Sequence, residues 1–423
     1  MKKQTNWAGN LTYQASRWYE PETQEEIIDI VKKSNKVRVV GSRHSFNDIA
    51  DTEETIICLK KLNNVIELDQ ENLTVTVEAG IIYSDLGKYL QSNGFALENM
   101  ASLPHISVAG ACATATHGSG NDNNCLSTSV RSMDIITATG EIINLSREKD
   151  EEEMNGAIVG LGGLGVVTML TLDVVPTFNI KQEVYENLSL ETLKDNFESI
   201  SASAYSVSLF TDWKDGMFNY VWLKHLVKEN TDSIKADDDF YGASLSKENR
   251  HPIPGIEADH CTEQLGVVGP WLDRLPHFKM DFTPSNGEEL QSEYILPRQH
   301  AFEALSAVND IRDQLYPLLH ISEIRTIASD DLWMSSCYKQ ESVGLHFTWK
   351  DNWEEVQQVL PKIEEVLAPF QARPHWGKLF TLAPEKVQSL YEKLPDFKQL
   401  LKKYDPNGKF RNKFMDSYIF GEK

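Results

Sequence analysis

Residues 39–47 read Val39-Val40-Gly41-Ser42-Arg43-His44-Ser45-Phe46-Asn47, a short β-branched run that stops at a glycine and continues into polar residues. A strand that ends here exposes backbone N–H groups, and Ser42, Arg43 and Ser45 add donors that bind an anion. Beside such an anion, His44 reaches the ring system that the anion carries. The plainer interpretation is a polar loop at the end of a strand with a hydrogen-bonded histidine.

A second segment, residues 102–120, is made almost entirely of small and hydroxyl side chains: SLPHISVAGACATATHGSG. Small side chains leave backbone N–H groups accessible to a pyrophosphate, and hydroxyls donate without adding charge. A tightly packed turn region is the alternative. Together with residues 39–47, this segment favours a cofactor site.

Residues 160–165 match the dinucleotide pattern G-x-G-x-x-G, but their context does not. The residues that follow, 166–172, are strand formers rather than the start of a helix. No clear acid lies about twenty residues further on, where a ribose partner is expected. We therefore expect no Rossmann site. Instead, we expect the glycines to let the backbone approach a bound cofactor closely.

Three polar groups occur late in the chain: Glu323-Ile324-Arg325, His346-Phe347-Thr348 and His375-Trp376-Gly377-Lys378. In a strand, residues two apart share a face, so each of the first two groups presents its polar pair together. Each group alone is typical of a surface ion pair. Together they supply what a site needs to hold a polyhydroxylated substrate and polarise one hydroxyl.

Length and charge limit the function classes. The chain has 423 residues, which indicates two domains, and its formal net charge is −22. An acidic surface repels phosphate backbones, so we expect no nucleic-acid partner. Neither a membrane-spanning run nor a signal peptide is predicted. We expect a cytoplasmic monomer.

The element pattern predicts a first boundary at Pro176. Before it we expect a helix after Pro21, strands at 37–40 and 73–79, a short helix at 85–93 and a hairpin at 135–145, with an exposed charged segment at 147–153. After it we expect strands at 207–210 and 217–223, a loop or lid at 228–262, and helices at 298–316 and 353–367.

Cysteine and histidine spacing gives no metal site. The five cysteines include no C-x-x-C pair, so neither a disulfide framework nor a zinc site is predicted. Six histidines show no ligand spacing and are interpreted as structural or surface residues: His225, His251, His260, His277, His300 and His320.

These motifs, with the ending at 405–410, resemble the vanillyl-alcohol-oxidase flavoprotein superfamily, and among its members the alditol oxidase (xylitol oxidase) group. The resemblance spans the chain in order. It implies an α+β, two-domain PCMH-type FAD-binding fold with an α/β substrate cap. The implied division is an FAD domain at 1–176, a cap at 177–378, and a segment at 379–423 that returns to the FAD domain.

The resemblance also implies the cofactor site. In these enzymes the histidine of the Arg-His-Ser run is bonded covalently to the flavin 8α-methyl group, which carries over to His44. A neutral imidazole is a suitable nucleophile for that bond. Further implied flavin contacts are Val39, Val40, Gly41, Ser42, Arg43, Ser45, Ser102, Ser107, Gly110, Ala111, Cys112, Ala113, His117, Val167 and His375.

The implied substrate is an alditol, and dioxygen is the second partner. The implied pocket consists of Ser102, Gln291, Glu323, Arg325, Thr348 and Lys378. Lys378 and Arg325, with His346, are expected to contact the C1 hydroxyl and stabilise its alkoxide character. Hydride passes to flavin, and dioxygen becomes hydrogen peroxide. Because a lone acid repels a carboxylate substrate, Glu323 disfavours oxidation of lactate or glycolate.

Other functions remain open. Within the same fold, the alternative is a sugar-1,4-lactone or other carbohydrate oxidase. A lactone-oxidising enzyme oxidises galactono- or gulonolactone but not xylitol. A dehydrogenase with another electron acceptor is a further possibility. From other classes, the alternatives are a flavin-binding protein without catalysis and a metal hydrolase that uses His105 and His117.

Overall fold

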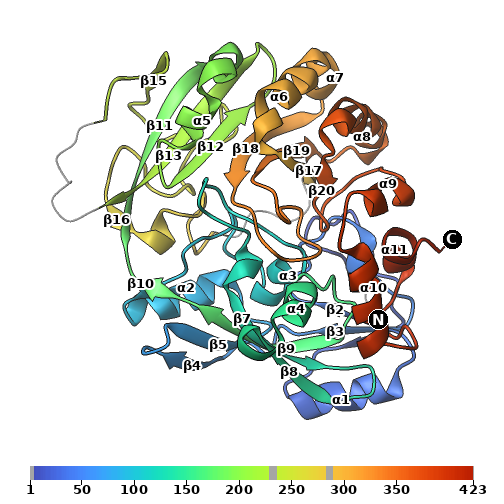
Figure 1. The fold of residues 1–423 in the computed structure, drawn as a ribbon. Coiled ribbons are helices and arrows are strands. Elements are labelled where there is room, and N and C mark those ends of the chain that lie inside the picture. Colours follow the sequence, from blue (N-terminus) through green and yellow to red (C-terminus); the bar gives the residue numbers. More distant parts are fainter. Residues whose placement is uncertain (1–3, 228–235, 283–288, 423) are drawn as a thin grey trace.

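Among the described residues, the first domain contains three sheets. In the computed structural model, which describes residues 4–227, 236–282 and 289–422, a parallel sheet has the order β1-β3-β2 and an antiparallel sheet has the order β4-β5-β9-β7-β8 (Figure 1). The strands are β1 (Arg17–Tyr19), β2 (Val37–Val40), β3 (Thr55–Cys58), β4 (Val65–Asp69), β5 (Thr74–Glu78), β7 (Val130–Ile136), β8 (Ile142–Ser146) and β9 (Val166–Asp173). Two short strands, β6 (Phe95–Ala96) and β10 (Val175–Pro176), pair with each other.

Helices cover these sheets. The helices are α1 (Gln24–Lys33), α2 (Tyr83–Ser92), α3 (Val108–Ala113) and α4 (Arg147–Ala157). Helix α1 is capped by Thr23, whose side chain accepts from the N–H of Glu26, and Lys32 and Lys33 lie in its last turn. It buries Ile27 and Val31. The predicted helix after Pro21 and the predicted hairpin, seen as β7 and β8, are both confirmed.

A larger sheet forms most of the second half. Its order among the described residues is β14-β15-β11-β13-β12-β18-β19-β17-β20, with β16 paired to β11. The strands are β11 (Asn179–Ser189), β12 (Ser206–Thr211), β13 (Met217–Val227), β14 (Asp239–Phe240), β15 (Ala243–Leu245), β16 (Gly269–Pro270), β17 (Glu289–Pro297), β18 (Leu319–Ile327), β19 (Ser342–Lys350) and β20 (Arg373–Pro374).

The two faces of this sheet differ. Apolar side chains on one face pack against helices α5 (Leu193–Ser201), α6 (Ala301–Asp310) and α8 (Trp353–Leu367), which lie along the outside of the molecule in Figure 1. The opposite face carries polar residues and contributes to the main cavity. The strict alternation of a strand therefore separates the core of this half from its functional surface.

The last helices pack against the first domain. Residues of α9 (Pro384–Ser389), α10 (Leu394–Tyr404) and α11 (Lys413–Met415) share a hydrophobic core with α2, α3 and α4. Figure 1 shows these C-terminal helices descending beside the sheets of the first domain. The division at 176 and 378 itself stays a prediction.

Arg38 joins the beginning of the chain to its end. Its guanidinium is buried and donates to the carbonyls of Leu161 (2.8 Å), Gly162 (3.0 Å) and Phe410 (2.8 Å), and also to that of Ile49. Burial lowers its pKa to about 10, and the nearby Asp48 carboxylate opposes that shift. Three chain segments are thereby held around one side chain.

One helix prediction is wrong in detail. The helix expected at 298–316 is interrupted, because Ile311 leaves the helical conformation (φ −103°, ψ 9°) between α6 and α7 (Arg312–Leu315). The segment at 147–153, expected to be charged and exposed, contains no buried residue and belongs to a helix, α4, whose last turn buries Met154, Gly156 and Ala157.

The loop or lid expected at 228–262 lies partly outside the described residues, which exclude 228–235. Residues 239–245 form the short strands β14 and β15, and the described residues that follow, 246–262, are irregular. The expectation for 160–172 is confirmed, because the glycines lead directly into β9 and not into a helix.

Candidate functional site

One cavity of about 470 Å³ collects the predicted site residues from both halves of the chain. It is lined by the loop after β2, by residues 101–117, by 161–167, and by the polar face of the large sheet. All the residues predicted for cofactor and substrate line this cavity, with the single exception of Cys112. Cavities of this size and mixed lining are typical of small-molecule sites.

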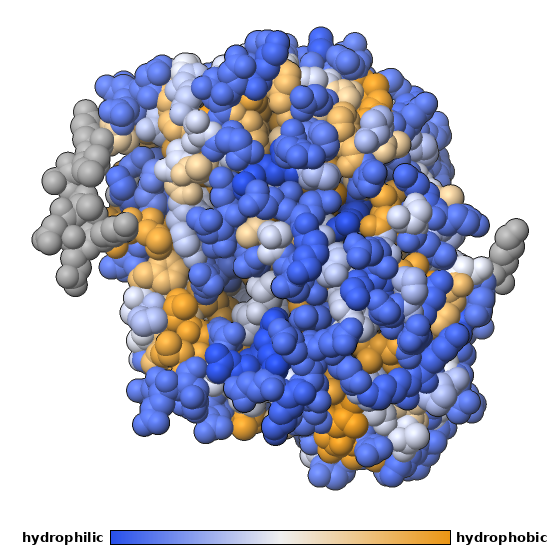
Figure 2. All heavy atoms as spheres, viewed as in Figure 1, coloured by the Kyte–Doolittle hydropathy of each residue, from blue (hydrophilic) through white to orange (hydrophobic). Residues whose placement is uncertain are grey.

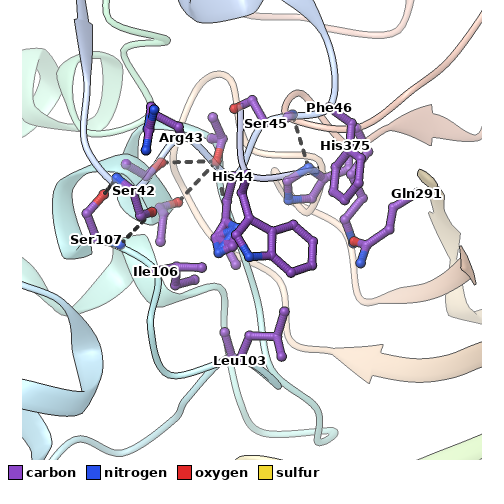
Figure 3. A pocket seen from close by; sticks show the side chains of 18 of the residues that line it. Ser42, Arg43, His44, Ser45, Phe46, Leu103, Ile106, Ser107, Gln291 and His375 are labelled. Atoms are coloured by element: carbon purple, nitrogen blue, oxygen red, sulfur yellow. Dashed lines mark hydrogen bonds between the residues drawn. The ribbon is translucent and has the colours of Figure 1, made fainter. Parts of the chain in front are cut away.

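The loop after β2 is held against residues 102–120 by two serines. The N–H of Ser107 donates to Ser42 Oγ (3.0 Å), and the N–H of Ser42 donates to Ser107 Oγ (3.3 Å). Figure 3 shows this pair on one side of the pocket and Gln291 on the other. A Cβ at Gly41 would lie 2.1 Å from Ser107 Oγ, so this contact requires glycine.

The backbone of this loop forms a cradle for an anion. Arg43 has φ of +63°, a left-handed conformation. In the part of the chain that the structure describes, the N–H groups of Arg43, His44 and Ser45 donate to no acceptor. Successive N–H groups around a left-handed residue form an anion-binding concavity, which fits a pyrophosphate.

His44 points into the cavity as a neutral imidazole. Its ring lies 4.5 Å, between centroids, from both Trp7 and His105. Burial lowers its pKa to about 3, and its Nε2 has no hydrogen-bond partner among the described residues. A neutral imidazole on a residue that lines the cavity fits a covalent bond to a bound group.

The segment 102–120 also approaches the cavity with its backbone. Ala109 and Gly110, in the first turn of α3, line it, as do Ala111 and Ala113. Cys112 points the other way: its Sγ packs 3.9 Å from Tyr83 Oη in the core. The helical period turns the Cys112 side chain away from the cavity, so the predicted cofactor contact of Cys112 would involve its backbone.

The large sheet presents the late polar groups on one face, as predicted. Glu323 pairs with His346 across β18 and β19, and His346 in turn with Glu293 on β17. Gln291 pairs with Thr348 in the same way. Each residue that lines the cavity lies two positions from the next along its strand.

Glu293 is the centre of this face, and sequence reasoning missed it. Its carboxylate accepts from Arg325 Nη2 (2.7 Å) and Lys378 Nζ (2.6 Å), and His117 Nε2 lies 3.2 Å away. Lys378, His117 and Arg325 hold its pKa well below the usual range despite complete burial. The sequence signal for Glu293 was its position two residues after Gln291, because residues two apart in a strand share a face.

Lys378 and His346 form a hydrogen-bonded pair. Lys378 Nζ donates to His346 Nδ1 (2.8 Å), so the hydrogen of the neutral ring is on Nε2 and donates to Thr348 Oγ1 (3.1 Å). Burial and the adjacent Lys378 ammonium keep the pKa of His346 well below its usual range. Burial also lowers the pKa of Lys378, and Glu293 opposes that shift.

The Lys378 loop is tied to the first motif. Asn47 Nδ2 donates to the carbonyls of Trp376 (2.9 Å) and Lys378 (2.8 Å). His375, in the same loop, faces the cavity as a neutral ring, with its pKa lowered to about 3 by burial. The loop of residues 39–47 therefore shapes both ends of the site.

Glu323 has a partner that the sequence did not reveal. His277 Nε2 lies 2.7 Å from Glu323 Oε1, and Arg325 Nε lies 3.6 Å from Glu323 Oε2. These charges keep the pKa of Glu323 far below its usual value. His277 and His251, interpreted from the sequence as structural or surface residues, both line the cavity.

The cavity therefore contains more than one carboxylate. Glu289 and Glu293 accompany Glu323, so the expectation of a lone acid is wrong. Glu289 Oε1 accepts from Gln291 Nε2 (2.6 Å), which leaves the Gln291 carbonyl oxygen to accept from a ligand. Burial raises the pKa of Glu289.

The described residues give no support to a metal site. Across them, no group of three or more His, Cys, Asp or Glu side chains is arranged to hold a metal ion. The alternative of a hydrolase using His105 and His117 therefore lacks a ligand set.

No described helix is both long enough and apolar enough to span a bilayer, and the face in Figure 2 is mostly hydrophilic.

Comparisons with known proteins agree with this geometry. Residues 15–146 match the family described as "FAD binding domain", and residues 283–418 match "D-arabinono-1,4-lactone oxidase". Over 420 residues, 99% of each chain, this protein is 44% identical to an alditol oxidase from a Streptomyces species. It is 28% identical to an L-gulono-1,4-lactone dehydrogenase from Mycobacterium tuberculosis, over 97% of each chain.

A solved structure also matches the fold. The cholesterol oxidase from B. sterolicum superposes with a TM-score of 0.79 at 13% sequence identity, covering 99% of this chain and 96% of that one. At this identity the likeness concerns the fold alone. It confirms the predicted fold class of a PCMH-type FAD-binding domain with a cap.

Proposed function

The chain belongs to the alditol oxidase family of FAD-binding flavoproteins, and on that basis we propose that it oxidises the terminal C1 hydroxyl of an alditol to the aldose, with dioxygen reduced to hydrogen peroxide. The observation that carries this proposal is the charge-balanced polar face in the cavity. Two carboxylates, Glu293 and Glu323, are each paired with cations. Such a site binds an uncharged polyol without needing a countercharge.

We assign the substrate contacts as follows. Glu323, Gln291 and Ser102 hold hydroxyls along the polyol chain, with Thr348 beside them. Lys378 and Arg325 donate to the C1 oxygen and stabilise its developing negative charge. His346, neutral and accepting from Lys378, receives a proton through that hydrogen bond as the C1 hydroxyl loses its own.

FAD supplies the hydride acceptor and passes the electrons to dioxygen. The residues proposed to hold it are the N–H groups of the loop after β2, Ser42 and Ser107, the backbone of α3, His117, Val167 and His375. The covalent bond to His44 is part of this proposal. The domain division, the cytoplasmic location and the monomeric state stay predictions.

The direct test is the visible spectrum of the purified protein under anaerobic conditions, before and after addition of xylitol. Flavin bands that bleach with xylitol and return with air are expected. Bands that stay unbleached by xylitol and sorbitol would contradict alditol oxidation.

A second candidate is oxidation of a sugar-1,4-lactone. It is favoured by the match of residues 283–418 to "D-arabinono-1,4-lactone oxidase" and by the similarity to an L-gulono-1,4-lactone dehydrogenase. Bleaching by galactono- or gulonolactone, with none by xylitol, would establish this candidate. Reoxidation by air then separates an oxidase from a dehydrogenase.

His44→Ala is expected to abolish the covalent bond. Because the imidazole proposed to form the bond is removed, flavin should separate from the acid-denatured protein and remain in the supernatant. Fluorescence of the washed pellet measures the outcome. His225→Ala, which changes a histidine on β13 away from the cavity, should retain flavin in the pellet. Flavin retained in the His44→Ala pellet would show that another residue holds it.

Glu323→Gln is expected to weaken polyol binding more than turnover. The amide cannot accept as strongly from substrate hydroxyls, and a hydrogen bond to a charged group contributes about 1.5–3 kcal/mol. We expect the KM for xylitol to rise at least about tenfold. Steady-state kinetics measure the two constants separately. An unchanged KM would remove Glu323 from the polyol site.

A further inference from the structure

Lys224 is a buried lysine that the proposed mechanism does not use. It lies on β13, on the same sheet face as the cavity residues, and only 1% of its surface is exposed. Among the described residues it forms no ion pair within 4.0 Å. Because an unpaired buried ammonium is costly, its hydrogen-bond partners decide whether the fold tolerates it.

Three acceptors satisfy this ammonium. Lys224 Nζ donates to the carbonyls of Leu275 and Pro276 (3.3 Å) and to His277 Nδ1 (3.2 Å). An ammonium group has three N–H donors and no acceptor. All three are used, and one of them reaches the ring that contacts Glu323.

The hydrogen bonds define the state of His277. Glu323 is ionised and can only accept, so His277 Nε2 carries the hydrogen at 2.7 Å. Lys224 occupies Nδ1, the nitrogen where a second proton would bind. The ring is fixed edge-on between Phe210 and Trp222, at centroid distances of 5.5 and 5.1 Å. It therefore cannot exchange its two nitrogens without disturbing that packing.

We propose that Lys224 is a positioning residue of the polyol site: by donating to Nδ1 of His277, it keeps that ring neutral, so that Glu323 receives one hydrogen bond and retains its lone pairs for substrate. Without Lys224, His277 protonates and pairs with Glu323 as an imidazolium, which draws the carboxylate away from substrate hydroxyls.

The surrounding charges agree with this role. Glu323 and Arg325 on β18 and the thiol of Cys261 are the other ionisable groups facing Lys224. Its cross-strand neighbours, Gln182 and Ser206, are uncharged. Burial lowers the pKa of Lys224 to about 7 and that of His277 to about 4, with Lys224 contributing to the latter shift. Below pH 7 the ammonium thus opposes protonation of His277.

The first test follows His277 directly and needs no substrate. In protein labelled with ¹³C-histidine, the His277 resonance is assigned by its loss in His277→Gln. In the wild-type protein the His277 ring should take up no proton between pH 5.5 and 8.5, and only the smaller shift caused by titration of Lys224 near pH 7 is expected. In Lys224→Met its midpoint should rise by about 1–3 pH units, the usual effect of removing a neighbouring like charge. An unchanged midpoint would overturn the proposal.

The second test measures kcat/KM for xylitol against pH, and rests on the proposed function. Lys224→Met should gain an acidic limb, with a loss of about tenfold, at the midpoint found by NMR. The matched background is His277→Gln, in which the amide side chain donates from its nitrogen at every pH. The double variant Lys224→Met/His277→Gln should therefore lack that limb. A limb that persists there would show that Lys224 acts through packing alone.

Other outcomes are also informative. If Lys224→Met does not fold, Lys224→Gln removes the charge but keeps an N–H donor, and a smaller upward shift of the His277 midpoint is expected; no shift would overturn the proposal. If the wild-type protein oxidises no polyol, the proposed function fails. The NMR titration still decides whether Lys224 controls His277.

Discussion

Replacement of Lys378 by methionine is expected to slow reduction of the flavin by xylitol about 10²- to 10³-fold, the loss typical of removing one donor from a developing oxyanion. Methionine keeps the length of the side chain but removes the ammonium that contacts both Glu293 and His346. The proton path to His346 is lost with it. Anaerobic stopped-flow absorbance, which follows bleaching of the flavin, measures the rate.

The matched control is Lys350→Met. Lys350 lies at the exposed end of β19, two residues after Thr348, and donates to the carbonyl of Pro317. The flavin of Lys350→Met should be reduced by xylitol at the wild-type rate. Flavin content must be equal in both variants, so that the comparison concerns catalysis. A wild-type rate in Lys378→Met would remove Lys378 from the mechanism.

Glu293→Gln is expected to damage both activity and stability. The carboxylate is the common partner of Arg325 and Lys378. Removing one member of a buried charge network costs about 3–5 kcal/mol, which in a chain of this length lowers the melting temperature by roughly 3–6 °C. Two cations without their anion also repel each other, so the rate of flavin reduction should fall at least about 10²-fold.

Thermal unfolding and stopped-flow reduction check the two effects separately. Glu341→Gln is the matched control, since the Glu341 carboxylate is exposed to solvent where it pairs with Arg298. Exposed ion pairs of this kind contribute at most about 1 kcal/mol. If Glu293→Gln melted and reacted like Glu341→Gln, the carboxylate would have no role in organising the site.

Much of the architecture was predictable because it depends on local patterns. The β-branched run at 37–40 followed by Gly41, and the hydrophobic spacing of 353–367, predict β2 and α8 with their observed bounds. The periodicity of a strand also placed Glu323 beside Arg325 and His346 beside Thr348 on one face. These predictions need only the geometry of the backbone.

The missing parts depend on contacts between distant segments. His277 lies in an irregular stretch, and only folding places it 2.7 Å from Glu323, 46 residues later. Glu293 lies between the polar pair Gln291-Ser292 and an apolar run in the sequence, and its cations come from β18 and from the loop containing Lys378. Charge pairing across such separations leaves no periodic signal, because each partner alone is typical of a surface residue.

The four carbonyls around Arg38 also determine how late in synthesis the fold around this side chain can be completed. Phe410 follows Arg38 by 372 residues, so at about 5–20 residues per second the ribosome needs roughly 19–74 s to deliver that partner. During this interval the parallel sheet lacks one of the contacts that close it, and Lys378 is also still absent from the Asn47 side chain that will hold its loop. The cofactor-binding half therefore cannot be completed until residues 378–410 have been synthesised.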